Sequence, residues 1–245
     1  MVKKRLAIYF TFISLLAGNT AFSQSNISTE HLDLEGDVLA WYDSQMGLQN
    51  TPLQIGNLNN AERKARRSHQ YLETPTWVKG NLIYRGQKFE NIDLLYDIYA
   101  DKLITKNTGN LRYAAQPVEL IKNQVSTFSI YDRVFEYIEE PVELFVKGFF
   151  EIMYRGENME VLVKRLKIVE IESDGVNAYS RYDKYFLRMD GEIHPLRNRF
   201  SVLKRFPNHK KEIRAYLRNQ GFPTFRLGND HQIKSLVAYC DALSS

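Results

Sequence analysis

The stretch KFENIDLLYDIYADKL, from Lys88 to Leu103, decides the fold class of this 245-residue chain. Apolar and polar residues alternate along it, which is the period of a β-strand with one buried face. The mainly apolar face holds Ile92, Leu94, Tyr96, Ile98 and Ala100. The other face holds Asn91, Asp93, Leu95, Asp97, Tyr99 and Asp101. We expect the first face to enter the core, and the second is the best candidate in the chain for a surface that contacts a ligand.

Four residues of the polar face form the predicted binding site: Asp93, Asp97, Tyr99 and Asp101. Two aspartates four positions apart on a strand cannot act as a catalytic pair, because about 13 Å separates them. An inverting pair of carboxyl groups needs about 6.5 to 9.5 Å, and a retaining pair needs about 5 Å. Asp93 or Asp97 could therefore act only with a carboxylate from another strand. The same aspartates could equally keep an exposed face hydrated, and the sequence leaves both interpretations open.

Alternation with frequent turn signals continues from Trp77 to about Leu196. The turn dipeptides are Arg85-Gly86, Asp101-Lys102, Thr108-Gly109, Arg155-Gly156, Asp174-Gly175 and Asp190-Gly191. Short strands separated by such turns are typical of antiparallel sheets. We predict a mainly β (α+β) fold, an antiparallel meander of about eight or nine strands that forms a barrel or half-barrel. A sheet of this kind can hold one small ligand.

The tripeptide Tyr-Arg-Gly occurs twice, at Tyr84–Gly86 and at Tyr154–Gly156. Each copy follows a segment that opens with Lys-Gly, and each precedes a returning strand. We expect both tyrosines to face the core and both arginines to lie at the solvent edge. Both glycines are expected to adopt the positive φ of a tight hairpin. The repeat therefore predicts two similar hairpins rather than a duplicated functional site.

From Asn198 onward the apolar residues recur at helical spacing. One helix is expected between Pro207 and Gly221, residues that suit the first position and the end of a helix. A last helix is expected from Asn229 onward. Its apolar stripe is Ile233, Leu236, Val237, Cys240 and Leu243. We predict that the helices cap the sheet and that Cys240, the single cysteine, lies in the core.

The first residues of the chain predict export. A basic start at residues 3–5 precedes a mainly apolar run from Leu6 to Ala17, as in a secretory signal peptide that is cleaved after Ser23. The next residue is not a cysteine, so we expect a periplasmic or extracellular protein that is not lipidated and has no transmembrane segment after cleavage. The predicted domains are the signal peptide (1–23), a polar lead-in (24–76), the antiparallel β domain (77–197) and helices packed on it (198–245).

The formal charge of the whole chain is +4, but three of the positive charges belong to the predicted signal peptide, which leaves +1. A protein with so little net charge lacks the electrostatic footprint of a nucleic-acid-binding domain. No nucleic-acid partner is therefore predicted.

Motifs of known catalytic or cofactor chemistry are absent from the sequence. It has no G-x-S-x-G, H-E-x-x-H or C-x-x-C motif and no Gly-rich phosphate loop. The five histidines are isolated, without another His or Cys at metal-ligand spacing. We therefore assign no catalytic residue, no metal ligand and no cofactor.

The run WVKGNLIYRGQKFENIDLLYDIYADKLI, from Trp77 to Ile104, resembles a group of secreted envelope proteins of Bacteroidota that have no established function. The shared features are a Trp, a Gly, an aromatic residue before a Gly turn, a Tyr-Asp pair and a later Asp. The resemblance continues loosely through GFFEIMYRGENMEVLVKR, from Gly148 to Arg165, and into the C-terminal helix pair. It implies an envelope location in a didermal bacterium and carries over no catalytic residue.

These observations favour a non-enzymatic envelope protein whose β domain binds a small hydrophobic or glycan ligand, or an envelope protein as partner. Two alternatives stay open. One is a hydrolase that acts on envelope polymers through carboxylates from different strands. The other is a structural component of a secretion or outer-membrane assembly complex.

Overall fold

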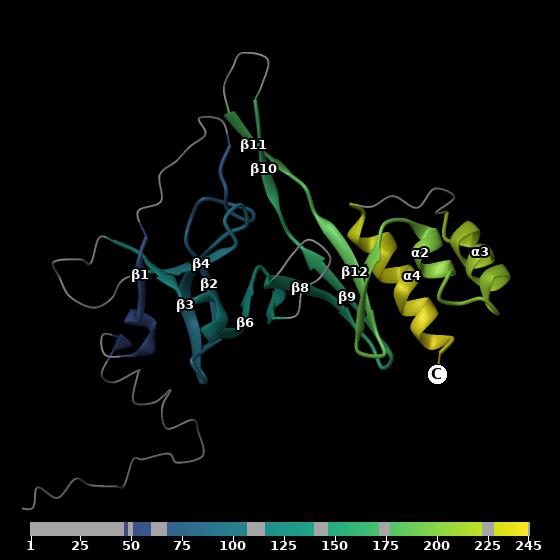
Figure 1. Ribbon diagram of the computed structural model, residues 1–245, viewed down its shortest axis with the longest axis horizontal. Coiled ribbons are helices and arrows are strands. Elements are labelled where there is room, and N and C mark those ends of the chain that lie inside the picture. Colours follow the sequence, from purple (N-terminus) through teal and green to yellow (C-terminus); the bar gives the residue numbers. More distant parts are fainter. Residues whose placement is uncertain are drawn as a thin grey trace, which may run out of the picture. The chain divides into compact units, whose positions relative to one another are not determined.

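The computed structural model describes residues 47–48, 51–59, 68–106, 116–139, 147–171, 177–221 and 228–244. All of these residues belong to one unit, Val38–Ser245. The predicted signal peptide and the predicted turns at 108–109 and 174–175 lie outside the described residues. The described part is mainly β, with three helices toward its C-terminal end (Figure 1), which confirms the predicted fold class.

Eleven strands form one large antiparallel sheet in the order β1-β5-β4-β3-β2-β6-β7-β8-β9-β12-β13. Their bounds are β1 Gly56–Leu58, β2 Val78–Tyr84, β3 Gln87–Asp97, β4 Lys102–Thr105, β5 Val118–Leu120, β6 Val125–Ile130, β7 Arg133–Ile138, β8 Gly148–Arg155, β9 Met159–Lys164, β12 Lys184–Met189 and β13 Glu192–Leu196. Consecutive strands pair along most of this ladder, so the antiparallel meander is confirmed. Within the described residues no strand pair joins β1 to β13, so a barrel or half-barrel stays a prediction.

The stretch from Lys88 to Leu103 forms two strands rather than one. β3 ends at Asp97, β4 begins at Lys102, and the four residues between them form a turn. Asp97 Oδ1 accepts hydrogen bonds from the backbone N–H groups of Tyr99 at 2.9 Å and Ala100 at 2.8 Å, which stabilises that turn. The predicted core face is correct as far as Ile98, which is buried in the core, whereas Ala100 is exposed; on the other face Asp97 is buried. The turn predicted at Asp101-Lys102 therefore begins three residues earlier, at Ile98. The described part of the chain contains thirteen strands, more than the eight or nine expected.

Three hairpins of the sheet have two-residue loops in which both residues have positive φ. The loops are Arg85-Gly86, Tyr131-Asp132 and Asp190-Gly191. Positive φ at both positions is the geometry of a type I′ turn, whose twist matches that of the paired strands. The first and third loops were predicted from their glycines, whereas Tyr131-Asp132 carries no glycine and was not predicted.

The second Tyr-Arg-Gly builds a different turn from the first. Arg155 is still paired in β8, and Gly156 has no positive φ, so the conformation predicted for Gly156 is wrong. A Cβ atom at Gly156 would instead collide with Oδ2 of Asp241, which lies in the last helix. That carboxylate accepts hydrogen bonds from the backbone N–H groups of Glu157 at 3.0 Å and Asn158 at 2.9 Å. Gly86 is required because its φ is positive, whereas Gly156 is required because Asp241 of α4 leaves no room for a Cβ atom.

The three helices are α2 Arg199–Leu203, α3 Lys210–Asn219 and α4 Asp230–Ala242, and two short 3₁₀ segments lie at Pro52–Gln54 and Lys122–Gln124. The predicted stripe of α4 is buried from Ile233 to Cys240, where burial also raises the pKa of the Cys240 thiol to about 12. α2 was not predicted, although Asn198 and Ser201 form a capping box at its start. In the described part of the chain no helix is long and apolar enough to cross a membrane.

Two hydrophobic clusters share one face of the sheet. The first gathers aromatic residues of the central strands, including Tyr96, Phe128, Phe135 and Phe149. The second joins β9 and β12 to the three helices, through residues such as Val163, Tyr185, Val202, Ile213 and Leu236. Glu151 lies two positions after Phe149 on β8 and pairs with Val163, so it faces the same side between the two clusters. A carboxylate in this position needs a cationic partner.

A separate two-stranded ladder continues from this region. β10 Lys167–Ile171 pairs with β11 Asn177–Arg181, and Figure 1 shows this hairpin extending beyond β9 and β12. Its base contacts the segment 68–73, because Lys167 Nζ donates to the carbonyl groups of His69 and Tyr71, both at 2.7 Å. Tyr71 also forms an isolated bridge with Asp97. Residues of the predicted lead-in therefore lie between β3 and the β10–β11 hairpin.

Candidate functional site

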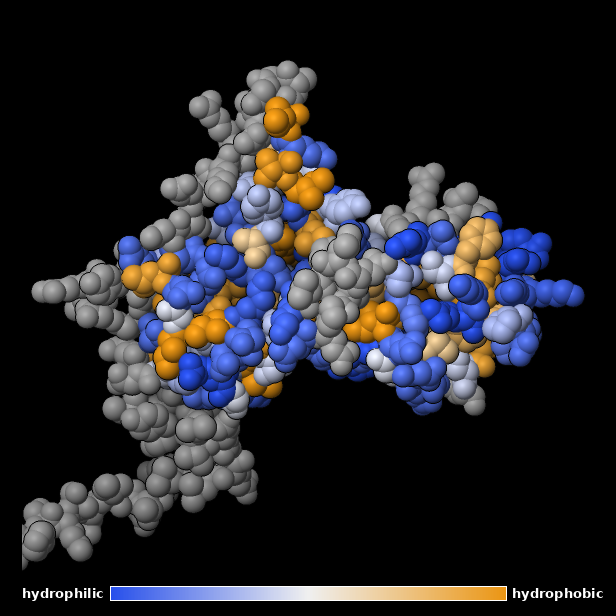
Figure 2. Space-filling model, viewed as in Figure 1, coloured by the Kyte–Doolittle hydropathy of each residue, from blue (hydrophilic) through white to orange (hydrophobic). Residues whose placement is uncertain are grey.

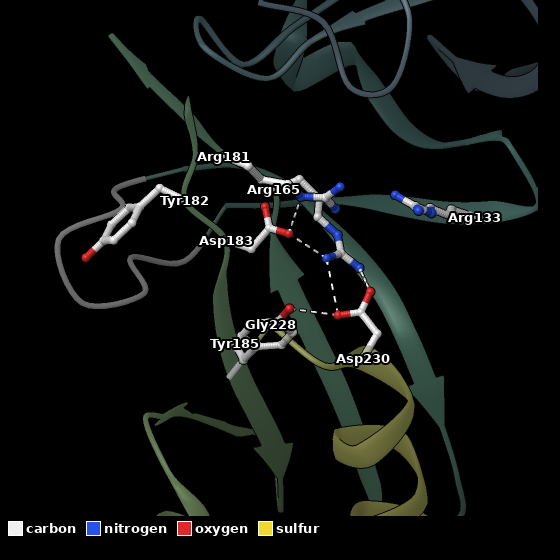
Figure 3. Close-up of a pocket in the computed structure, with 8 residues that line it drawn as sticks. All are labelled: Arg133, Arg165, Arg181, Tyr182, Asp183, Tyr185, Gly228 and Asp230. Carbon is white, nitrogen blue, oxygen red and sulfur yellow. Dashed lines mark hydrogen bonds and ion pairs between the residues drawn. The ribbon is translucent and has the colours of Figure 1, made fainter. Parts of the chain in front are cut away.

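Arg165 is the centre of the candidate site and is only 1% exposed. It lies directly after β9, where the large sheet gives way to the β10–β11 ladder. Its guanidinium donates from Nε to Glu151 at 2.6 Å. It also donates from Nη1 to Asp183 and from Nη2 to Asp230, both at 2.7 Å (Figure 3). These bonds use the planar fork of donors that distinguishes arginine from lysine. A buried cation is tolerated here because three carboxylates surround it.

The three carboxylates come from separate elements. Glu151 lies on β8, Asp183 lies between β11 and β12, and Asp230 is the first residue of α4. The position of Asp230 at a helix N-terminus further favours its negative charge. Burial alone would lower the pKa of Arg165, but its hydrogen bonds to Glu151 and Asp230 outweigh this effect and raise the pKa. Arg165 therefore stays charged and ties the helices to the sheet.

Tyr185 completes the inner shell of the cluster, which consists of Arg165, its three carboxylate partners and Tyr185. Its hydroxyl donates to Asp230 Oδ1 at 2.7 Å, and its ring lies under the guanidinium of Arg165, with 6.0 Å between Cζ and the ring centroid. Burial alone would raise the pKa of Asp230, but the hydrogen bonds from Arg165 and Tyr185 lower it below its ordinary value. Asp230 is therefore an ionised acceptor whose side chain remains 40% exposed.

Two further arginines surround this inner shell. Arg133, at the start of β7, and Arg181, at the end of β11, both pair with Oε1 of Glu73, at 2.8 Å and 3.4 Å. Arg181 Nε also donates to Asp183 at 2.7 Å. The side chains of Arg133 and Arg181 are 28% and 39% exposed, although Nη1 of Arg133 is itself buried.

A cleft of about 480 Å³ opens at this cluster. It is lined by Arg133, Arg165, Arg181, Tyr182, Asp183, Tyr185, Gly228 and Asp230. Its size lies within the range of small-molecule sites. The ring of Tyr182 is 52% exposed and points away from the charged cluster (Figure 3). The cleft thus offers hydrogen-bond donors, one exposed acceptor and an accessible aromatic ring.

None of the four residues predicted as a binding site lines this cleft. Asp93 pairs with Lys106 at 2.9 Å and Lys79 at 3.4 Å, and the hydrogen bond from Lys106 lowers the pKa of Asp93. Asp97 is buried, and this burial raises its pKa while its Oδ1 holds the β3–β4 turn. Both aspartates already have structural partners.

Asp101 and Tyr99 lie in or next to the same turn. Asp101 accepts hydrogen bonds from the Tyr96 hydroxyl at 2.7 Å and from Lys164 and Lys122 at 2.8 and 3.0 Å. Tyr99 is 45% exposed, and its ring contacts that of Tyr179 edge to face with 5.2 Å between centroids. The four predicted residues are therefore not brought together into one site, and Tyr99 is the most accessible of them.

The residues of the cleft were not selected from the sequence. One local signal was present, since Lys164 and Arg165 follow the apolar residues 161–163 at adjacent positions, so that alternation would bury one of them. The structure buries both. Among the described residues, no group of three or more His, Cys, Asp and Glu side chains could hold a metal ion. Comparison with known protein families, with curated proteins and with solved structures gives no match to this chain.

Proposed function

We propose that this chain is an exported, non-enzymatic binding protein that takes a glycan in the cleft beside Arg165. One observation carries the proposal: hydrogen-bond donors, an ionised acceptor and an exposed tyrosine line one cleft, with the tyrosine ring directed away from the charged cluster. Arg133 and Arg181 supply N–H donors, Asp230 supplies an ionised acceptor, and Tyr182 supplies the ring. The export half of the proposal rests on the signal peptide predicted from residues 1–23.

A glycan matches this combination of groups better than the other ligand classes expected from the sequence. Sugar hydroxyls both donate and accept, so they can bind arginine N–H groups and a carboxylate at the same time. The apolar face of a sugar ring can pack on an aromatic side chain. A purely hydrophobic ligand would leave the charged groups of the cleft without hydrogen bonds, at a cost in binding free energy.

The cluster also meets the need for a rigid site. Arg165 is held by three carboxylates, and these contacts need not break when a ligand binds to the outer arginines. Groups that are already fixed lose less conformational entropy on binding. The proposal depends only on this cleft and does not require the sheet to close into a barrel or half-barrel.

Binding is favoured over hydrolysis by the charge state of the cluster. A glycoside hydrolase needs one carboxylic acid that stays protonated through a raised pKa. Here the pKa of Asp230 is lowered, and Glu151 and Asp183 accept hydrogen bonds from the cation of Arg165. The pKa of Asp97 is raised, but its Oδ1 accepts two backbone hydrogen bonds of its own turn.

The proposal is tested with an oligosaccharide array, followed by calorimetric titration of the best ligand. Tyr182→Ala should weaken binding roughly tenfold, because it removes the ring on which the sugar packs. Tyr99→Ala is the matched control, since Tyr99 is an exposed tyrosine outside the cleft. The absence of any oligosaccharide ligand would overturn the proposal. Loss of binding in Tyr99→Ala alone would move the site to the β3–β4 turn.

A further inference from the structure

The C-terminal helical segment is far more basic than the chain as a whole. Residues 197–245 contain ten Lys and Arg but only three Asp and Glu, a net charge of +7 against +4 for the entire chain. The residues before Arg197 therefore carry a net negative charge. The net charge of the whole chain does not reveal this separation of positive and negative regions. Such a separation creates a local electrostatic field that can steer association with a charged partner.

The acidic residues of this segment do little to offset its cations. Asp230 is bound to Arg165 and Tyr185, and Asp241 is buried against the β8–β9 turn. Glu212 is exposed, and its carboxylate lies 3.1 Å from Nδ1 of His209. The positive charge of the helices is therefore presented to solvent with little compensation.

Six cations form what we call the basic face: Lys204, Arg205, Lys210, Lys211, Arg214 and Arg218. All six are exposed, and none has an ion-pair partner among the residues that the structure describes. Lys210, Arg214 and Arg218 follow one another at a spacing of four along α3, which places them on one stripe. The surface over α3 is mainly hydrophilic in Figure 2.

An aromatic side chain is exposed at the same end of the chain. Phe200 on α2 is 57% exposed, and the guanidinium of Arg199 lies 5.1 Å from its ring centroid. An apolar ring among cations is typical of proteins that adsorb to the interface of an anionic bilayer, where the cations contact lipid phosphates and the ring enters the headgroup region.

We propose that the basic face docks the protein on an anionic membrane surface, with α2 and α3 toward the lipid phosphates. The observations favour a membrane over single-stranded nucleic acid, because stacking of successive bases needs several free rings, and of the two aromatic residues of α2 and α3 only Phe200 is exposed. Tyr216 is already stacked on Tyr239, with 4.1 Å between centroids and 5° between planes. The negative net charge of the rest of the chain orients the molecule, because an anionic surface repels it.

The test is co-sedimentation of the purified chain with vesicles of phosphatidylcholine alone and of phosphatidylcholine containing about one third phosphatidylglycerol. We expect binding only to the anionic vesicles, and loss of that binding at high salt. The quadruple variant with Gln at Lys210, Lys211, Arg214 and Arg218 should bind at least tenfold more weakly. Phe200→Ala should weaken binding by a smaller factor, about threefold.

The matched control removes the same number of charges elsewhere, with Gln at Arg85, Lys88, Lys106 and Lys147, which are exposed in the β part of the chain. Circular dichroism checks that both quadruple variants fold. We expect the control to bind anionic vesicles within about twofold of the wild type. Equal binding to neutral vesicles, or equal losses in the two variants, would overturn the proposal. Displacement of the protein from the vesicles by a stoichiometric oligonucleotide would assign the face to nucleic acid instead.

Discussion

Arg165 Nη2 donates to Asp230 Oδ2 at 2.7 Å, and this contact joins the residue after β9 to the first residue of α4. The same guanidinium binds Glu151 and Asp183, so one side chain connects β8, the β11–β12 junction and the helices. These contacts lie between the two hydrophobic clusters of the sheet. Arg165 is thus both the floor of the cleft and a structural link, and its two roles can be separated by mutation.

Arg165→Met should destabilise the fold by about 3 to 5 kcal/mol, because it leaves buried carboxylates without their cation. Arg181→Met is the matched comparison, since Arg181 belongs to the same cluster but is 39% exposed. It should cost at most about 1 kcal/mol, as expected for partly exposed ion pairs. Urea unfolding of the two variants measures the difference. Equal losses would mean that Arg165 is not the central link.

Stability should also depend on pH through Asp230. Burial raises the pKa of this carboxyl, but hydrogen bonds from Arg165 and Tyr185 bring it below the ordinary 3.8 in the folded protein. A lowered folded-state pKa stabilises the fold above the unfolded-state pKa, and this contribution is lost as the pH falls through the folded value.

We therefore expect the urea midpoint to fall below about pH 4 in the wild type. Asp230→Asn should be less stable than the wild type at pH 7 and should lose less stability between pH 7 and pH 3. The comparison needs unfolding curves at several pH values. Parallel pH profiles for the two proteins would show that Asp230 does not contribute in this way.

The two copies of Tyr-Arg-Gly predict different mutational behaviour. Gly156→Ala places a methyl group against Asp241 and should destabilise the protein by about 2 kcal/mol or more. Gly86→Ala meets no atom within 4 Å and suffers only from its φ of +80°, a cost of about 1 kcal/mol.

A double-mutant cycle with Asp241→Ala distinguishes the two causes. Removal of the carboxylate relieves the closest collision and frees the Tyr154 hydroxyl, which lies 2.5 Å from the new Cβ and is hydrogen-bonded to Asp241, so Gly156→Ala should cost less in that background. Gly86→Ala should cost the same in both backgrounds, because Gly86 does not contact Asp241. Additive effects of Gly156→Ala and Asp241→Ala would rule out the proposed collision.

The parts of the fold that follow a local period could be predicted from the sequence. Apolar residues recur at every second position along β3, because one of its faces is buried, and at helical spacing along α4. Both elements could therefore be located from the sequence. The turn predicted at Asp101-Lys102 was placed too late, because residues 98–100 continue the alternation, although the Asp97 side chain already closes the turn. A glycine such as Gly156 signals a local restriction, but the sequence does not say whether φ or a distant carboxylate imposes it.

The cleft could not be predicted, because its contacts join residues that are far apart in the chain. Arg165 lies 14, 18 and 65 positions from Glu151, Asp183 and Asp230. Contacts between such distant positions produce no periodic pattern in the sequence. Considered singly, each of the three carboxylates looks like an ordinary exposed residue. The aspartates of β3 were selected instead because they share one strand, and a strand is the unit that a single sequence reveals.

The most direct measurement of the proposed site is an NMR titration that follows the arginine side-chain Nε–H signals while the best oligosaccharide is added. Arg133 and Arg181 should shift with ligand concentration, because their partly exposed side chains line the cleft. The signal of Arg165 should stay close to its starting position, because its side chain is only 1% exposed and keeps its three carboxylate partners. Saturable binding that shifts neither Arg133 nor Arg181, with changes confined to the β3–β4 turn around Tyr99, would contradict a glycan site in this cleft.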